Sequence, residues 1–381
     1  MQDAGGTRFL HVNGHVRMGG TSSVRSDWRQ AHLPLLLHPN PRRALFLGVG
    51  TGATLAAAAA VPGLRATGVE LSPEVVTLLP WFAEAGAPPL PPVTIADARR
   101  FVAADTGAYD VIVADLFHPA LDGTGALYAA EHFAAVRARL APGGVFCQWL
   151  PLYQMDLPTL RAIIRSFLQA YPEGSAWLAH YSLQTPMLAL VGGAAPGMDP
   201  VAAAARLARF APPAVARRTG LLGPMDMLGL HVGGARGLAA FAGPGPANTD
   251  DRPVVALDAL RNVQALAASP ADRLLAVLGG VARSGYGPRL DAYWRARDRF
   301  IAAGASVPAG ASGRALVDAA APGLLGAVRI SPEFDPAYIP LLSMAQALAG
   351  VDRAAARALL QDIAAAAPDR PEAVRLLRAM P

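Results

Sequence analysis

Lysine is absent from this sequence of 381 residues, so all 33 of its basic side chains are arginine. A nucleoside triphosphate site of the P-loop type needs a lysine that reaches the phosphates, and the absence of lysine argues against that class of protein. The arginines are spread along the chain without a run or interleaved aromatic residues, and the formal net charge is only +5. This distribution argues against a nucleic-acid groove, so we expect no nucleic-acid partner.

Cysteine is nearly absent too. The single cysteine, Cys147, excludes a disulfide within the chain and fits a reducing compartment, so we expect a cytoplasmic protein. Its neighbours Val145, Phe146 and Trp149 indicate a buried thiol in a strand rather than a nucleophile. The Gly-x-Ser-x-Gly motif of serine hydrolases does not occur. The histidines lack the spacing of metal ligands, such as His-Glu-x-x-His, and no metal site is predicted.

Long hydrophobic runs are missing, although 53% of the residues are hydrophobic. Many of these residues are alanine, and 38 glycines and 34 prolines interrupt the apolar segments. The longest uncharged stretch, residues 178–198, carries His180, Gln184 and Pro186, which the core of a bilayer disfavours. We therefore expect no membrane-spanning segment. The first residues lack a basic start followed by an apolar core, so no signal peptide is predicted.

Short apolar segments alternate with helical stretches between residues 44 and 149. This spacing is typical of βαβ units around a parallel sheet. Two further apolar runs, 176–181 and 187–191, are close enough in the sequence to pair as an antiparallel edge. The sequence therefore predicts a doubly wound, Rossmann-like α/β fold with a seven-stranded sheet of the class I methyltransferase type. The five predicted parallel strands are 44–47, 66–69, 93–96, 111–114 and 145–149.

Both ends of the chain differ from this pattern. Residues 8–24 alternate apolar and polar side chains around Asn13-Gly14, which predicts a β-hairpin. Residues after 265 have a helical pattern, and 335–368 has the length of one tetratricopeptide-type (TPR-like) unit, although an ordinary helical hairpin fits equally well. The predicted domains are an N-terminal β-hairpin element (1–30), an S-adenosyl-binding Rossmann-like domain (31–195), a helical and loop extension (196–264) and an α-helical tail (265–381).

The turn between the first predicted parallel strand and its helix is rich in glycine, which permits the turn and lets a ligand approach the backbone closely. Glu70 ends the next strand, where its carboxylate can accept both hydroxyls of a ribose. Asp97 follows the third strand, where it can accept from an adenine amino group. Capping of helices by these two acids is the alternative. The predicted nucleotide-binding residues are Gly48, Gly50, Thr51, Gly52, Glu70, Leu71, Asp97, Ala98 and Asp115.

A fourth strand delivers Asp115 into the crevice where the strand order of such a sheet reverses. The sequence from Tyr109 to Pro119 resembles the spermidine synthase family of aminopropyltransferases, whose fourth strand ends in an Asp, two small residues, a second Asp and a Pro. Asp115 matches the first, catalytic Asp of this family, and His118 stands at the position of the second. The resemblance covers about residues 8–195.

Within residues 8–195 the resemblance includes residues 10–14 and 32–35, the glycine loop, Glu70, Asp97 and Gln148. The chain looks most similar to bacterial members in which the synthase follows a membrane-spanning region. Residues 248–253 resemble that branch too. Because no such region is expected here, the resemblance implies a membrane partner as one arrangement.

The resemblance also implies a reaction. The family's donor is decarboxylated S-adenosylmethionine; a primary amine such as putrescine attacks the methylene carbon beside its sulfonium, and methylthioadenosine leaves. An alkylamine is protonated at neutral pH, so it must lose a proton before it attacks. Asp115 is the predicted catalytic residue that orients the amine and takes this proton. His118, Gln148 and Tyr153 are the predicted substrate-binding residues, and the family suggests a homodimer.

The departures from the family pattern lie on the amine side. Family members present a Gln after the hairpin turn and then an Asp-Glu pair followed by Tyr. The replacement by His118 also removes a negative charge that would hold a diammonium substrate. Asp27 and the acids at 250 and 251 are candidates to compensate. Counted back from His32, the family's four positions hold Arg17, Ser22, Ser23 and Ser26.

Two other functions stay open at this point. An S-adenosylmethionine-dependent methyltransferase uses the same loop and acids, but its site must accommodate the carboxylate of the donor. A non-catalytic binding or scaffold protein, with a decayed synthase core and a helical tail as its partner surface, is the third possibility. The retention of Glu70, Asp97 and Asp115 argues against complete decay. The nucleoside released from each donor separates the two enzymatic functions.

Overall fold

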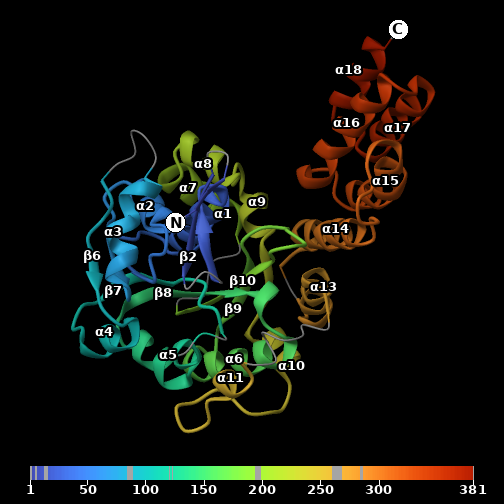
Figure 1. Cartoon of the computed structure of the whole chain (residues 1–381). Helices are drawn as coiled ribbons and strands as arrows, with labels where there is room; N and C mark the ends of the chain where they lie inside the picture. The colour runs from blue at the N-terminus through green and yellow to red at the C-terminus, as the bar shows by residue number, and fades with distance from the viewer. Residues whose placement is uncertain are drawn as a thin grey trace. The chain divides into compact units, whose positions relative to one another are not determined.

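The computed structural model describes residues 2–4, 7–12, 16–83, 89–119, 121, 123–193, 199–259, 268–283 and 286–380. The chain divides into two compact units (Figure 1). Unit 1 comprises Met1–Arg273 and Gly279–Arg283, and unit 2 comprises Leu274–Leu278 and Ser284–Pro381. Helix α13 (Pro270–Gly280) contributes residues to both units.

An eight-stranded mixed sheet underlies unit 1, in the order β11-β9-β10-β8-β7-β4-β5-β6. The five strands from β8 to β6 are parallel, and β10, β9 and β11 extend the sheet as antiparallel strands. The predicted doubly wound α/β architecture is therefore confirmed. The strands are β4 (Arg43–Leu47), β5 (Arg65–Glu70), β6 (Val93–Ile95), β7 (Tyr109–Ala114), β8 (Leu140–Pro151), β9 (Ser175–Leu178), β10 (Met187–Gly193) and β11 (His231–Gly234).

The predicted number of seven strands is wrong, because β11 adds an eighth. It comes from the segment 196–264, for which the sequence predicts helices and loops. β11 pairs with β9 across an irregularity between His231 and Gly233. Four residues that include two glycines have little strand propensity of their own. Their pairing with a strand distant in the sequence depends on tertiary structure, which local patterns do not report.

Strand β4 lies between β5 and β7 and is parallel to both. The chain therefore moves outward from β4 in one direction through β5 and β6, and then returns to the other side of β4 with β7. Sheets of this kind bind ligands at the carboxyl ends of their strands, at the point where the order reverses. The turns that follow β4, β5 and β7 are thus the expected place for a site.

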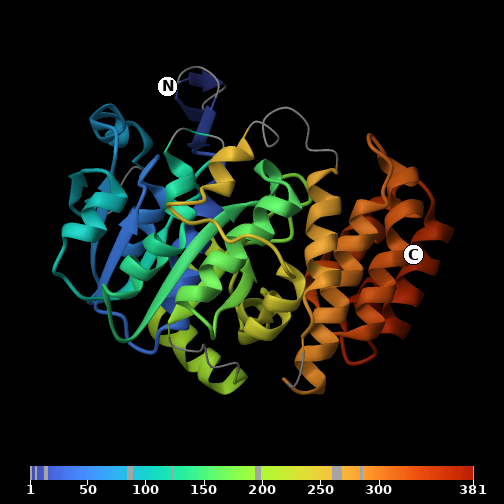
Figure 2. The ribbon, with the colours of Figure 1, turned by 90° about the horizontal axis from the view of Figure 1, so that it is seen from below.

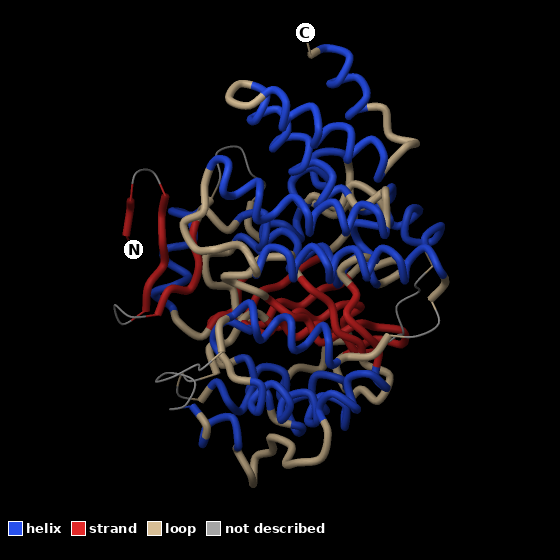
Figure 3. The backbone as a smooth tube through the Cα atoms, turned by 90° about the vertical axis from the view of Figure 1, so that its right-hand side faces the viewer, coloured by secondary structure: helices blue, strands red, loops and turns tan. Residues whose placement is uncertain are grey.

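Helices cover both faces of the main sheet, as Figures 1 and 3 show. One face carries α1 (Val24–Leu37), α2 (Ala53–Ala59) and α3 (Pro73–Phe82), and the other carries α4 (Ala98–Ala104), α5 (Ala130–Arg137) and α6 (Leu157–Ala170). Aromatic rings fill the interface between the sheet and the helices of this second face. Phe167 meets Phe133 edge to face at a centroid distance of 5.5 Å and stacks on Tyr171 at 4.9 Å. These rings are fully buried, so they contribute a large share of the apolar burial that stabilises unit 1.

The first residues form a separate three-stranded antiparallel sheet (Figure 3). It consists of β1 (Gln2–Ala4), β2 (Thr7–Val12) and β3 (Val16–Gly20). The pairing of β2 with β3 agrees with the predicted hairpin. The predicted turn residues Asn13 and Gly14 lie outside the described residues. The loop after β3 leads directly into α1, which connects this small sheet to the face that carries the site.

The segment after β10 adds helices to both faces of the main sheet. Helices α7 and α8 pack on α1, and α10 and α11 pack on α6. The segment thereby belongs to unit 1. Its helices are α7 (Pro200–Phe210), α8 (Pro213–Thr219), α9 (Pro224–Leu228), α10 (Ala235–Ala242) and α11 (Val254–Leu257).

Unit 2 is helical throughout its described residues (Figure 2, orange to red). Each of its helices packs on the next in sequence. The predicted helical pair at 335–368 is present as α16 and α17, with Tyr338 and Ile363 fully buried and Leu342 only partly buried. The TPR-like interpretation stays a prediction. The helices are α14 (Pro288–Ala305), α15 (Gly313–Ile330), α16 (Asp335–Ala349), α17 (Arg353–Ala366) and α18 (Glu372–Ala379).

Candidate active site

The glycine loop connects β4 to α2, as predicted, and its backbone needs glycine. Gly48, Gly50 and Gly52 have φ angles of 84°, 53° and 81°, in the left-handed region. At Gly48 there is also no room for a side chain, because an added Cβ would lie 3.1 Å from the Cβ of Asp115 and 3.1 Å from the ring of Phe117. The loop backbone therefore lies against the residues that follow β7.

Glu70 holds this loop in place. Its Oε2 accepts hydrogen bonds from the backbone N–H groups of Val49 (3.0 Å) and Gly50 (3.2 Å), and its Oε1 accepts from that of Ser72 (3.1 Å). Ser72, not Glu70, caps the following helix α3, so the capping alternative is wrong for Glu70. A carboxylate offers about four acceptor positions in total. One remains for a ribose hydroxyl, and that predicted role stays a prediction.

Asp97 is the N-cap of α4 and accepts from the backbone N–H of Arg100 at 2.8 Å. The capping alternative is therefore right for Asp97, whose second carboxylate oxygen remains available to a ligand. Its neighbour Ala98 is the first residue of α4, and small. Leu71, directly after β5, is 67% exposed. An apolar side chain left in solvent beside a strand end suits contact with a flat ring.

Asp115 follows β7 and lies opposite the glycine loop. Its Oδ1 accepts from the backbone N–H of Leu116 at 2.8 Å, and its own N–H donates to the carbonyl of Leu47 in β4 at 2.9 Å. Burial, assisted by the negative charge of Glu70, raises the pKa of Asp115 to about 6. A carboxylate with a pKa near neutrality is suited to accepting and releasing a proton.

The other predicted substrate residues surround Asp115 to different degrees. Gln148 in β8 is fully buried and donates from Nε2 to the carbonyls of Asp115 (3.1 Å) and Trp149 (3.0 Å). His118 is partly buried, which lowers the pKa of its imidazole and favours the neutral ring. Burial raises the pKa of Tyr128, the charge of Asp115 adds to this shift, and Tyr153 in the turn η2 (Leu152–Gln154) contributes to it as well.

Of the three candidate acids, Asp27 lies close enough to Asp115 for their charges to interact, and its compensating role stays a prediction. It lies on α1, where its Oδ2 accepts from the Ser23 hydroxyl at 2.9 Å. Burial raises the pKa of Asp27 to about 7, and the charge of Asp115 contributes to this shift. The sequence offered Asp27 only as one candidate among three. The position of Asp27 depends on the packing of α1 against β7 and β8.

Asp250 and Asp251 do not reach this point. Asp250 forms an ion pair with Arg99 of α4, and Asp251 is exposed. Of the family's substituted amine positions, Ser22 is exposed, and Ser23 occupies the N-cap position of α1 without a capping hydrogen bond and donates its hydroxyl to Asp27. Ser26 carries a buried hydroxyl without a hydrogen-bond partner among the described residues. Arg17 lies in β3, and its side chain is outside the described set.

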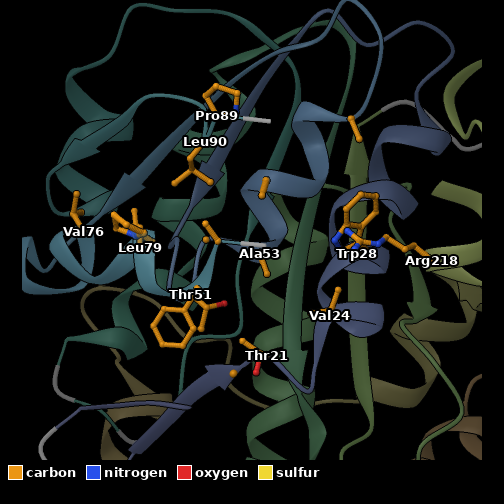
Figure 4. Close-up of a pocket in the computed structure, with 17 residues that line it drawn as sticks. Thr21, Val24, Trp28, Thr51, Ala53, Val76, Leu79, Pro89, Leu90 and Arg218 are labelled. Atoms are coloured by element: carbon orange, nitrogen blue, oxygen red, sulfur yellow. The ribbon is translucent and has the colours of Figure 1, made fainter. Parts of the chain in front are cut away.

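A cavity of about 700 Å³ lies beside the glycine loop (Figure 4). Thr51 and Gly52 line it together with Val24 and Trp28 of α1. Its walls are otherwise mostly apolar, and Leu79 and Leu90 stand opposite α1 in the view. Glu70, Asp97 and Asp115 are not among its lining residues. No local sequence pattern indicates this cavity, because its walls come from four separate segments.

Among the described residues, no group of three or more histidine, cysteine, aspartate or glutamate side chains is arranged to hold a metal ion. The described part of the chain also contains no helix with the length and apolar character needed to cross a membrane. Cys147 is fully buried in β8, and burial raises the pKa of its thiol.

The chain is similar to known proteins mainly through unit 1. A polyamine aminopropyltransferase of Aeropyrum pernix is 37% identical over 142 residues, which cover 34% of this chain and 45% of that protein. Putrescine N-methyltransferase 3 of Nicotiana tabacum is 30% identical over 167 residues, covering 42% of this chain and 43% of that protein. The chain spans about half the length of these relatives.

A solved structure of a spermidine synthase in complex with the transition-state analogue AdoDATO matches 56% of this chain and 81% of its own, with 21% identity and a TM-score of 0.45. The resemblance found in the motifs is supported most directly by a family model. The model of the spermine/spermidine synthase domain matches residues 29–170, a range that contains the glycine loop, Glu70, Asp97, Asp115 and Gln148.

Proposed function

We propose that the protein is an aminopropyltransferase that moves the aminopropyl group of decarboxylated S-adenosylmethionine to an amine and releases methylthioadenosine. One observation carries this proposal: a partly buried carboxylate with a pKa of about 6, Asp115, stands directly against the glycine loop at the point where the strand order reverses. The match of residues 29–170 to the spermine/spermidine synthase domain supports it. The activity of the whole protein is part of this proposal, because the chain covers only 45% and 43% of the length of the two relatives described above.

The residues present fit the donor. A loop backbone without side chains at Gly48 and Gly50 admits a nucleoside, Glu70 keeps an acceptor position for a ribose hydroxyl, and Asp97 keeps one carboxylate oxygen beside the small Ala98. Leu71 offers an apolar surface to the base. When bound, the donor supplies an electrophilic methylene carbon next to a positively charged sulfur.

Asp115 prepares the acceptor for attack. An ammonium ion gives up a proton to the Asp115 carboxylate, and the nitrogen lone pair then forms a bond to the methylene carbon. The carbon–sulfur bond breaks as the nitrogen–carbon bond forms, and its electron pair stays on sulfur. The nitrogen of the product amine carries one more carbon substituent than that of the substrate. Asp115 later releases its proton to solvent. Gln148 positions the turn that carries Asp115 through its hydrogen bond to the Asp115 carbonyl.

A methyltransferase is the second candidate, and a specific observation favours it. Putrescine N-methyltransferases are among the relatives, at 30% identity over 167 residues. Such an enzyme uses S-adenosylmethionine with its carboxylate intact and releases S-adenosylhomocysteine. The two candidates therefore differ in the nucleoside that appears.

The test incubates the protein with each donor and a panel of primary amines and identifies the nucleoside by chromatography. We expect methylthioadenosine from the decarboxylated donor. Asp115→Asn should lower kcat by a factor of about 10² to 10⁴, the usual contribution of a general base, while the donor still binds in calorimetry. The matched control is Asp362→Asn, because Asp362 is exposed on α17 of unit 2. S-adenosylhomocysteine as the product would establish the second candidate instead.

Binding of neither donor would favour the non-catalytic alternative. The finer expectations also remain proposals: a cytoplasmic location, a homodimer, and a relation to the bacterial branch with a membrane-spanning region, in which a membrane protein is a partner. The single buried cysteine supports the first of these. The similarity of residues 248–253 supports the last.

A further inference from the structure

Two elements border both the cavity and the carboxylate pair Asp27 and Asp115. The first is helix α1. Val24 and Trp28 of α1 line the cavity, and Asp27 follows Val24 by three residues, which places it on the same side of the helix. The glycine loop is the second element. Its Gly48 end lies against Asp115, and its Gly52 end lines the cavity.

Two buried amide oxygens accompany the carboxylates. Gln30 is 2% exposed and donates from Nε2 to Asp27 Oδ1 at 3.4 Å, while Gln148 is fully buried and donates to the carbonyl of Asp115. These donations fix the orientation of both amides. The Oε1 atoms of Gln30 and Gln148 then have no hydrogen-bond partner among the described residues. Buried acceptors without donors are costly, and a ligand that brings N–H groups removes that cost.

A protonated primary amine fits this group of acceptors. An ammonium carries three N–H donors and one positive charge, and two carboxylates with two amide oxygens supply acceptors and negative charge in a buried place. The backbones of α1 and β8 are joined at this point, because the Trp149 indole donates to the Gln30 carbonyl at 3.1 Å. The acceptors are therefore held by buried structure rather than by a surface loop.

The cavity has a different chemistry from the carboxylate pair. Its one charged side chain among the described lining residues is Arg218, whose guanidinium lies 4.6 Å from the centre of the Trp28 ring (Figure 4). Alanine, valine, leucine and proline supply most of the remaining wall. A second ammonium group placed in this cavity would lose its hydration and face a guanidinium, with no carboxylate among the described walls. An alkyl chain or an apolar ring meets no such penalty.

We propose that the acceptor is a primary monoamine with an apolar body, with its nitrogen between Asp27 and Asp115 and its body in the cavity beside Trp28. This inference rests on the proposed transfer of a group from a sulfonium donor to an amine, and it names the class of that amine. It differs from a putrescine-like acceptor by the absence of a second positive charge. Asp27 and Trp28 are then residues that determine specificity.

The test compares pentylamine with putrescine, because the two molecules have the same number of non-hydrogen atoms and differ in a terminal methyl against a terminal ammonium. Nucleoside release is measured for each amine at a saturating concentration of donor. We expect kcat/KM to be higher for pentylamine by about tenfold or more, from the burial of its methyl end and the avoided desolvation of a charge. A preference for putrescine would overturn the inference and leave the proposed transferase activity standing.

Variants locate the two parts of the site. Arg218→Glu should reduce the preference for pentylamine by supplying the missing carboxylate. Arg217→Glu should leave the preference unchanged, because Arg217 is exposed like Arg218 but does not line the cavity. Trp28→Ala should raise KM for pentylamine and leave KM for methylamine unchanged, since methylamine has no body to bury. Asp27→Asn should raise KM for every amine and leave KM for the donor unchanged. An unchanged ratio in Arg218→Glu would count against the cavity as the place of the amine's body.

Calorimetry without the donor gives a result even for an inactive protein. We expect pentylamine to bind more tightly than putrescine and Asp27→Asn to weaken both. Equal or reversed affinities would overturn the inference independently of any turnover. Failure of the proposed function has a separate signature, namely no nucleoside release with any amine. Thermal melting checks the variants, and Asp27→Asn should not lower the melting temperature at pH 8, because the ionised carboxylate is buried at a cost.

Discussion

Asp27 and Asp115 keep their protons to a higher pH than ordinary aspartates do. Burial is the main cause for both, and the negative charge of Asp115 adds to the shift of Asp27. Interaction between two titrating groups is mutual, so the charge on each one favours the protonated form of the other. An ammonium bound between them reverses this balance, because its charge favours both ionised forms. The pair therefore binds a proton or a cation in the same place.

This pair predicts the pH dependence of the reaction. Asp115 with a pKa of about 6 is ionised above that pH, so kcat/KM should fall about tenfold for each pH unit below it. Asp27, with a pKa of about 7, is protonated and uncharged in the range where Asp115 titrates, so Asp27→Asn should leave this acid limb in place. The other titratable groups that interact with Asp115 are Glu70, whose charge opposes ionisation, and the buried Tyr128.

Rates of nucleoside release between pH 4.5 and 8, at low donor concentration, measure this profile. A control with Asp362→Asn should reproduce the acid limb of the unaltered protein. An acid limb near pH 4, the ordinary value for aspartate, would contradict the role given to Asp115. An acid limb that Asp27→Asn shifts would contradict the order in which the two carboxylates titrate.

At the scale of elements, one asparagine joins three segments on the face opposite to α1. Asn248 is 1% exposed; its Nδ2 donates to the carbonyl of Gly125 at 2.9 Å, and its Oδ1 accepts from the N–H of Val255 at 3.0 Å. Its backbone N–H and carbonyl both bond to the hydroxyl of Ser166 in α6. Residues 248–253, which resemble the bacterial branch of the family, thus hold parts of unit 1 together through Asn248.

Asn248→Ala should destabilise unit 1 by about 2–4 kcal/mol, because it leaves a buried carbonyl and a buried N–H without partners. Urea unfolding followed by circular dichroism measures the change. Asp251→Ala, three residues along the same segment at an exposed position, is the matched control and should shift the free energy of unfolding by less than about 0.5 kcal/mol. A loss equal to that of the control would show that Asn248 is not a structural joint.

The sequence predicted most of the main sheet and part of the site. Strands β4, β5, β7 and β8 are visible as apolar runs because helices bury both of their faces, and parallel topology then brings Gly48, Glu70 and Asp115 to one edge. β11 was missed because its pairing with β9 is set by distant residues. Asp27 lies on a helix whose docking against β7 and β8 no local pattern reports. Asp97 fitted two roles, and the structure shows the capping role directly.

At the scale of the whole molecule, the two compact units predict two unfolding events. Each unit contains its own buried core, with Trp149 and Trp177 in unit 1 and Trp294 in unit 2. A ligand that binds the native form of one unit stabilises that unit alone. Donor at about 100 times its dissociation constant adds about 2.7 kcal/mol to the bound unit.

Calorimetry should therefore show two transitions, of which the donor raises one. Trp294→Phe assigns them, since the four remaining tryptophans all belong to unit 1 and their fluorescence then follows that unit only. We expect the transition seen by fluorescence in this variant to be the one that the donor raises. A single transition that coincides for both methods would mean that the units unfold together.

The buried cysteine gives this protein a probe that needs no engineering. Cys147 is the only thiol in the sequence, and it lies in β8 one residue before Gln148, with no exposed surface. A thiol reagent reaches it only when the middle of the main sheet opens, so the rate of labelling reports how often that happens. Because the chain has no second thiol, one labelled mass-spectrometric peak measures how often the sheet opens at Cys147, with or without a small molecule bound at the site.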